Sequence, residues 1–187
     1  MVRQLQTASG PLSRRFDVSS VKDGGTVFRV VTSAAEREAV AVDCGLPGID
    51  ALEADFRVAR DGPDGVRVTG TVKARIRQTC VVSLDEFPAG LDEAVDVGFA
   101  TEAEVEARTA RAARLAQDEH EEDDLPDPIL GGRIDLGALA AEILVLGLDP
   151  YPRKPGVTFA EPAAATPDEP EASPFAMLRK LKGAGDA

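Results

Sequence analysis

One segment, residues 66–78, alternates apolar and polar side chains over almost its whole length. In an extended strand, successive side chains point to opposite faces. The apolar set is Val66, Val68, Val72, Ala74 and Ile76, and the polar set is Arg67, Thr69, Thr71, Lys73, Arg75 and Arg77. A period of two over so many residues indicates an antiparallel sheet with one buried face and one face in water.

Shorter segments around it predict the rest of the fold. We expect further strands at residues 13–18, 26–31, 52–60 and 92–99. Ser33 and Glu36 form a capping box that starts a helix over residues 34–43. Asp135 is the expected N-cap of a nearly all-apolar helix over residues 135–148, and Pro150 ends it. We therefore predict an α+β fold, with an antiparallel, curved or barrel-like sheet packed by two or three helices.

The patterns also divide the chain. We expect a single α+β domain over residues 10–155, with a protruding helix at 101–119 and an acidic segment at 118–127. Residues 156–172, rich in Pro, Ala and Glu, predict a disordered linker. The linker leads to a short amphipathic helix over residues 173–182, whose apolar edge is Phe175, Leu178 and Leu181. A tethered peptide of this kind is a form often used to dock onto a partner or back onto the body.

The net charge of −12 argues against binding nucleic acid through the global field of the protein. Residues 1–116 are nearly balanced, with 15 basic and 18 acidic side chains, whereas residues 117–187 carry 6 and 15. We expect a cytoplasmic protein, because no apolar stretch approaches a membrane span and the N-terminus lacks the apolar core of a signal peptide.

The chain carries no recognisable catalytic motif, so we expect no enzyme, no catalytic residue, no cofactor, no metal and no small-molecule substrate. Its one histidine, His120, lies in the acidic segment. Cys80 falls on the apolar face of its strand, which favours a buried core cysteine. The alternative is a thiol-dependent enzyme or redox protein that uses Cys80, although Ser83 stands where a Cys-x-x-Cys pair would need its second thiol.

Two groups of side chains are candidates for binding. The first is Lys73, Arg75 and Arg77, which could contact RNA phosphate; the competing interpretation, which we slightly favour, pairs this face with Glu53 and Asp55 of the neighbouring strand. The second is Tyr151, Arg153 and Lys154, in a short basic hook after the apolar helix.

Three segments in this order resemble the YceD family of large ribosomal RNA subunit accumulation proteins. They are Gln78–Pro88, with its cysteine and acidic turn; Gly132–Arg153, with its Ile-Asp-Leu helix and following prolines; and Ser173–Lys182, similar to the tail of alphaproteobacterial members. Many members carry Cys-x-x-Cys where this chain has Cys80 and Ser83.

The resemblance implies a non-enzymatic role in the accumulation of large-subunit ribosomal RNA, and hence in ribosome assembly. The expected partner is a ribosomal protein of the large subunit or an rRNA precursor. The charge of the chain favours a protein, or a mixed protein–RNA surface. The acidic segment is then a solvated linker, a cover for the basic strand face, or a docking site for a basic partner. The oligomeric state stays open.

Overall fold

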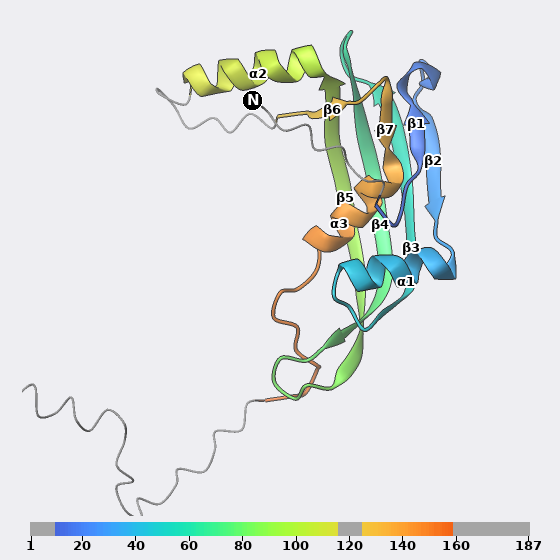
Figure 1. Ribbon diagram of the computed structural model, residues 1–187, viewed down its shortest axis with the longest axis vertical. Coiled ribbons are helices and arrows are strands. Elements are labelled where there is room, and N and C mark those ends of the chain that lie inside the picture. The colour runs from blue at the N-terminus through green and yellow to red at the C-terminus, as the bar shows by residue number, and fades with distance from the viewer. Residues whose placement is uncertain (1–9, 116–124, 159–187) are drawn as a thin grey trace, which may run out of the picture. The chain divides into compact units, whose positions relative to one another are not determined.

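Strand β4 (Gly65–Thr79) lies at the centre of a five-stranded sheet (Figure 1). The strand order is β2-β3-β4-β5-β6, in which β2 is Thr26–Val31, β3 is Gly48–Arg60, β5 is Glu86–Thr101 and β6 is Asp127–Ile129. All neighbours are antiparallel except β5 and β6, which run parallel. The computed structural model describes residues 10–115 and 125–158, without the side chains of residues 113–115.

The alternation in β4 has the predicted effect. Val66, Val68 and Val72 are fully buried, whereas Lys73 and Arg77 are about half exposed. The buried face is covered by helix α1 (Ala34–Asp43), helix α3 (Leu136–Leu146) and a two-stranded sheet of β1 (Arg15–Asp17) and β7 (Arg133–Asp135) (Figure 1). The core side chains outside the main sheet include Leu12, Phe16, Val40, Ile134, Leu136, Leu139 and Leu144. The α+β prediction is confirmed.

The sheet is open, so the barrel-like alternative is wrong. Closure would require its two edge strands, β2 and β6, to pair with each other, and each has one strand neighbour in the sheet. The helices fill the space that a closed sheet would have enclosed. The first predicted strand also differs: Arg15–Asp17 pairs with β7 and not with the main sheet, and Val18–Ser20 forms a 3-10 turn.

Strands β4 and β5 form a long hairpin without a register shift, from Gly65 opposite Ala100 to Thr79 opposite Glu86. Beyond one end of the ladder, the Cys80 N–H donates to the Asp85 carbonyl over 2.9 Å. Beyond the other end, the Thr101 N–H donates to the Asp64 carbonyl over 3.1 Å. Because both end pairs follow the same register, the hydrogen-bonding pattern alternates without interruption between them.

Both predicted helix caps are present, and they are linked through Arg14. The Ser33–Glu36 capping box starts α1, and a Glu36 carboxylate oxygen lies 2.7 Å from the Arg14 guanidinium. The Asp135 carboxylate accepts from the backbone N–H groups of Gly137 and Ala138, each over 3.0 Å, and thereby caps α3. The same carboxylate accepts from the Arg14 N–H over 2.7 Å and from the Ser13 hydroxyl over 2.5 Å.

Several predicted segments fall partly or wholly outside the described residues. Helix α2 (Glu102–Leu115) begins where the helix at 101–119 is expected. Residues 116–124 are not described, and they include the predicted end of this helix and residues 118–124 of the acidic segment. The chain divides into the units Met1–Pro155 and Gly156–Ala187. Of the second unit only residues 156–158 are described, so most of the linker and all of the helix at 173–182 lie outside.

Replacing Asp135 by Ala should lower the free energy of unfolding by roughly 2–4 kcal/mol, because the helix loses its cap and Ser13 and Arg14 lose their acceptor. Urea unfolding followed by circular dichroism measures the change. Asp17→Ala is the matched control, since Asp17 caps only the short 3-10 turn and is exposed; its effect should stay below about 1 kcal/mol. Equal losses would contradict the linking role of Asp135.

Glu36 should make the fold sensitive to acid. Its hydrogen bond to Arg14, helped by the Ser33 backbone N–H, lowers the pKa of this carboxyl to about 2. A lowered pKa contributes stability that is complete above about pH 5 and is lost as the pH falls towards 2. Glu36→Gln should therefore be less stable than wild type at pH 6 and similar to it near pH 2, as measured by thermal unfolding. A constant difference across this range would contradict the assignment.

Candidate functional site

The two predicted groups of binding residues lie in different places. Lys73, Arg75 and Arg77 project from the outer, solvent-facing side of β4. Tyr151, Arg153 and Lys154 belong to the hook, defined here as Asp149–Pro155, which lies beside the turn Cys80–Asp85 at the end of the β4–β5 hairpin. Within the described part of the chain, no hydrogen bond or ion pair joins one group to the other.

The cations on β4 largely have acidic neighbours. Lys73 lies 3.1 Å from a carboxylate oxygen of Asp92 on β5, and Arg77 lies 3.6 Å from one of Asp50 on β3. Arg75 is opposite the uncharged Ala51 and Gly90. These pairs are about half exposed, so each contributes at most about 1 kcal/mol. Their main effect is to leave little net positive charge on the strand.

The cations of β4 do pair with acids of neighbouring strands, as expected. The acids that pair with Lys73 and Arg77 are Asp92 and Asp50, however, and not Glu53 and Asp55. Both carboxylates lie near Arg29 of β2, at 2.8 and 3.5 Å. The register does place Glu53 directly opposite Lys73, yet the ion pair of Lys73 forms with Asp92 on its other side. The outer face therefore carries charges of both signs, in which cations of β2 and β4 pair with acids of β3 and β5.

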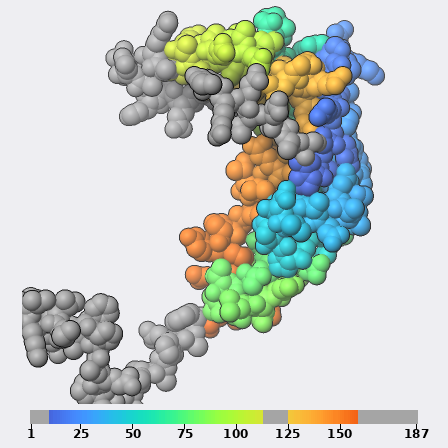
Figure 2. Space-filling view, viewed as in Figure 1, coloured from blue at the N-terminus to red at the C-terminus, as the bar shows by residue number. Residues whose placement is uncertain are grey.

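The hook is fixed to the turn by several contacts. The Val81 N–H donates to the Pro152 carbonyl over 2.9 Å, and the Lys154 ammonium lies 3.2 Å from the Asp85 carboxylate. In addition, the Gln78 side-chain amide donates to the Asp149 carbonyl at the start of the hook, over 3.4 Å. Figure 2 shows the atoms of the hook, in orange, beside those of the hairpin end, in green. Two segments about 70 residues apart in the chain thus form one surface.

Cys80 is the buried centre of the turn. Its side chain is completely enclosed, as predicted for a core cysteine. Its sulfur accepts from the backbone N–H groups of Val82 and Ser83, each over 3.4 Å. Hydrogen bonding to the Ser83 side chain and N–H, and to the Lys154 N–H of the hook, lowers the pKa of the thiol to about 6. The buried sulfur therefore links the turn to the hook through hydrogen bonds.

The turn and hook expose three large apolar side chains. Leu84 is 76% exposed, Tyr151 73% and Val81 46%. Leu84 also has a φ of +62°, in the left-handed region that costs a residue with a side chain about 1 kcal/mol or more. We call Val81, Leu84, Asp85, Tyr151, Arg153 and Lys154 the turn–hook surface. Sequence reasoning missed Val81 and Leu84, although the acidic, turn-like stretch after Cys80 indicated where the chain reverses.

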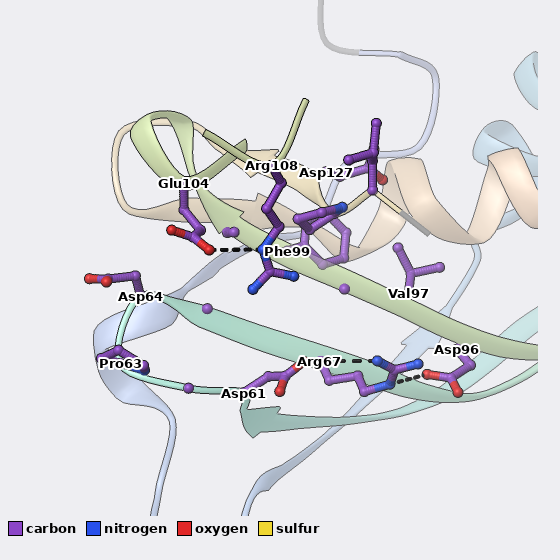
Figure 3. A pocket seen from close by; sticks show the side chains of 16 residues that line it. Asp61, Pro63, Asp64, Arg67, Asp96, Val97, Phe99, Glu104, Arg108 and Asp127 are labelled. Atoms are coloured by element: carbon purple, nitrogen blue, oxygen red, sulfur yellow. Dashed lines mark hydrogen bonds and ion pairs between the residues drawn. The ribbon is translucent and has the colours of Figure 1, made fainter. Parts of the chain in front are cut away.

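A polar cleft of about 360 Å³ lies near the opposite end of β4, between the β3–β4 turn, β5 and the start of α2 (Figure 3). Both of its arginines pair with acids of the cleft. Arg67 lies 2.5 Å from an Asp96 oxygen, and Arg108 lies 2.8 Å from one of Glu104, one helical turn away. None of the predicted binding residues lines this cleft, and its internal pairing leaves the turn–hook surface as the stronger candidate.

The described residues contain no helix long and apolar enough to cross a membrane. Nor do any three His, Cys, Asp or Glu side chains in this part of the chain gather in a way that could hold a metal ion.

The enclosure of Cys80 predicts slow chemistry at its thiol despite the lowered pKa, because a reagent must reach the sulfur. In a Cys44→Ala variant, which leaves Cys80 as the single thiol, a maleimide should label the native protein far more slowly than the urea-unfolded protein. Wild type is the control, since the half-buried Cys44 offers a second site. Native labelling as fast as unfolded labelling would revive the thiol-enzyme alternative.

The family model described as large ribosomal RNA subunit accumulation protein YceD matches residues 68–182, which include all three segments on which the resemblance was stated. The matched range begins within β4 and contains both halves of the turn–hook surface. Searches of curated proteins and of solved structures returned no match.

Proposed function

Because this chain belongs to the YceD family, whose name refers to accumulation of the large ribosomal RNA subunit, we propose that it is a non-enzymatic factor in ribosome assembly. In this proposal it acts in the cytoplasm by binding a ribosomal protein of the large subunit through the turn–hook surface. The observation that carries the proposal is the exposure of Leu84 and Tyr151 where the turn and the hook, both inside the matched range, are held together.

The character of this surface favours a protein partner. Exposed Leu84, Tyr151 and Val81 provide apolar contact area, and Arg153 and Lys154 give it a polar rim. Tyrosine and arginine are among the side chains that most often dominate binding energy at protein interfaces. The hook is already ordered by its contacts with the turn, so a partner would not have to immobilise it.

The charges argue against rRNA as the primary contact. The chain has a net charge of −12, and the cations of β4 stand among carboxylates. Binding RNA phosphate requires clustered cations that can release counterions. In this proposal, Lys73, Arg75 and Arg77 make a secondary contact to rRNA within an assembling subunit. The acids that face Lys73 and Arg77 weaken this contact.

The thiol-enzyme alternative has no support from the geometry. A nucleophilic thiolate needs access to its substrate, and the Cys80 side chain is enclosed. Its sulfur is occupied by N–H groups from the turn and the hook. The lowered pKa is accounted for by these structural contacts, and it implies no reaction.

A pulldown from cell lysate, with and without nuclease, followed by sucrose-gradient profiling, tests the proposal. Tagged wild type should co-migrate with large-subunit precursors and retain a ribosomal protein after nuclease treatment. Tyr151→Ala should reduce that capture about tenfold or more, because it removes an exposed aromatic contact of the kind that dominates interfaces. Val27→Ala is the matched control: Val27 is also 73% exposed but lies on β2, so capture should be unchanged.

Three outcomes would contradict parts of this proposal. Failure of wild type to co-migrate with precursors or to retain a ribosomal protein would overturn the assembly role. Capture that disappears with nuclease would make an rRNA precursor the direct partner. A Lys73→Gln/Arg75→Gln/Arg77→Gln variant should change nuclease-resistant capture by less than about threefold, since those cations are secondary; a larger loss would move the primary contact to β4.

A further inference from the structure

Among the residues that the structure describes, strand β5 has a long edge without a neighbouring strand. On one side it pairs with β4 along its whole length. On the other side it pairs with β6 at Phe99–Thr101 alone. Within the described part of the chain, residues 86–98 thus have a strand neighbour on one side only. An edge of this length presents a row of backbone donors and acceptors to which another strand can bond.

The hydrogen-bonding pattern identifies which backbone groups face outward. In an antiparallel ladder, bonded and non-bonded pairs alternate. Asp85 and Thr101 both bond to the β4 side, at opposite ends of an unbroken register, so the odd-numbered residues of β5 face β4. The even-numbered residues then direct their N–H and C=O groups to the free edge. They are Glu86, Pro88, Gly90, Asp92, Ala94, Asp96 and Gly98, of which Gly98 lies against Pro126.

Pro88 agrees independently with this pattern. Proline has no N–H, so within a sheet it is tolerated where that position would face outward from an edge strand. Gly90 is the next outward position, and a side chain added there would meet open space. Pro88, Gly90, Asp92, Ala94 and Asp96 are all exposed.

The same edge already accepts one strand, because β6 pairs with its last three residues in parallel. The rest of β5 is acidic. Strand β5 carries Glu86, Asp92, Glu93 and Asp96 and neither Lys nor Arg. On its outer face, Asp92 and Asp96 pair on one side with Lys73 and Arg67 of β4 and remain more than half exposed. Its inner face continues the core through Leu91 and Val95. An added strand would match it best with basic side chains on the outer face and apolar ones on the inner face.

We propose that the free edge of β5, from Pro88 to Asp96, binds an extended basic segment of a partner protein as an added strand. The identification of that partner as a protein of the large subunit rests on the proposed function. β-Strand addition takes its affinity from main-chain hydrogen bonds and its specificity from alternate side chains. The opposite edge strand, β2, is a weaker candidate because it has only six residues and includes the cation Arg29.

Hydrogen exchange with a defined probe tests the edge directly. A short peptide of alternating Lys and Val supplies the required pattern, and one of alternating Glu and Val is its control. By NMR, the Lys–Val peptide should slow exchange of the Gly90, Asp92, Ala94 and Asp96 amides in the full chain. The Glu–Val peptide should not. Absence of binding by the Lys–Val peptide, or protection confined to other residues, would overturn the proposal.

Proline substitution provides the matching variants. Ala94→Pro removes an outward N–H and leaves the ladder to β4 intact, so the Lys–Val peptide should bind about threefold to tenfold more weakly. Ala94→Val keeps the N–H and should bind as wild type. Gly90→Pro, with Gly90→Ala as its control, repeats the comparison if Ala94→Pro fails to fold. Equal binding by a folded proline variant and its control would overturn the proposal.

The peptide assay needs no ribosomal component, so the two proposals fail separately. If the peptide binds the edge but wild type does not co-migrate with large-subunit precursors, only the proposed function is overturned. If wild type and Ala94→Pro capture the same ribosomal protein equally and the peptide does not bind, only the edge proposal is overturned.

Discussion

The carboxylate of Asp135 holds together parts of the chain that are far apart in sequence. It caps α3 through two backbone N–H groups and receives two further hydrogen bonds from Ser13 and Arg14. Arg14 in turn binds Glu36 in the capping box of α1. The start of each packing helix is thus anchored to the same short segment. Because the hook directly follows α3, the position of the turn–hook surface depends on this set of contacts.

The sequence predicts those parts of the fold that have a local signal. The alternation of β4 reveals its buried and exposed faces, and side chains near Ser33 and Asp135 mark the helix starts. The pairing of β1 with β7 and of β6 with β5 has no comparable signal. Each of these strands has only three residues, and β6 contains Pro128, which argues against a strand in any local reading. Their positions follow from tertiary contacts.

The same distinction applies to the candidate site. Tyr151, Arg153 and Lys154 stand out in sequence because they follow a helix end blocked by proline. Their neighbours Val81 and Leu84 do not, since the proximity of hook and turn arises from pairings such as Val81 with Pro152. On β4, the prediction that acids offset the cations was physically sound. It missed the partners because an outer-face side chain has neighbours on both adjacent strands, and Lys73 pairs with β5.

The length of the β4–β5 hairpin sets a scale for anything that binds it. Fifteen residues at about 3.3 Å each place the Cys80 turn roughly 50 Å from the β3–β4 turn, measured along the strand. That span exceeds the reach of any single side chain or small ligand. A binding partner that touches the hook and also follows the edge towards β6 must itself be elongated. The length of the hairpin therefore favours an elongated partner, whatever the charge of that partner.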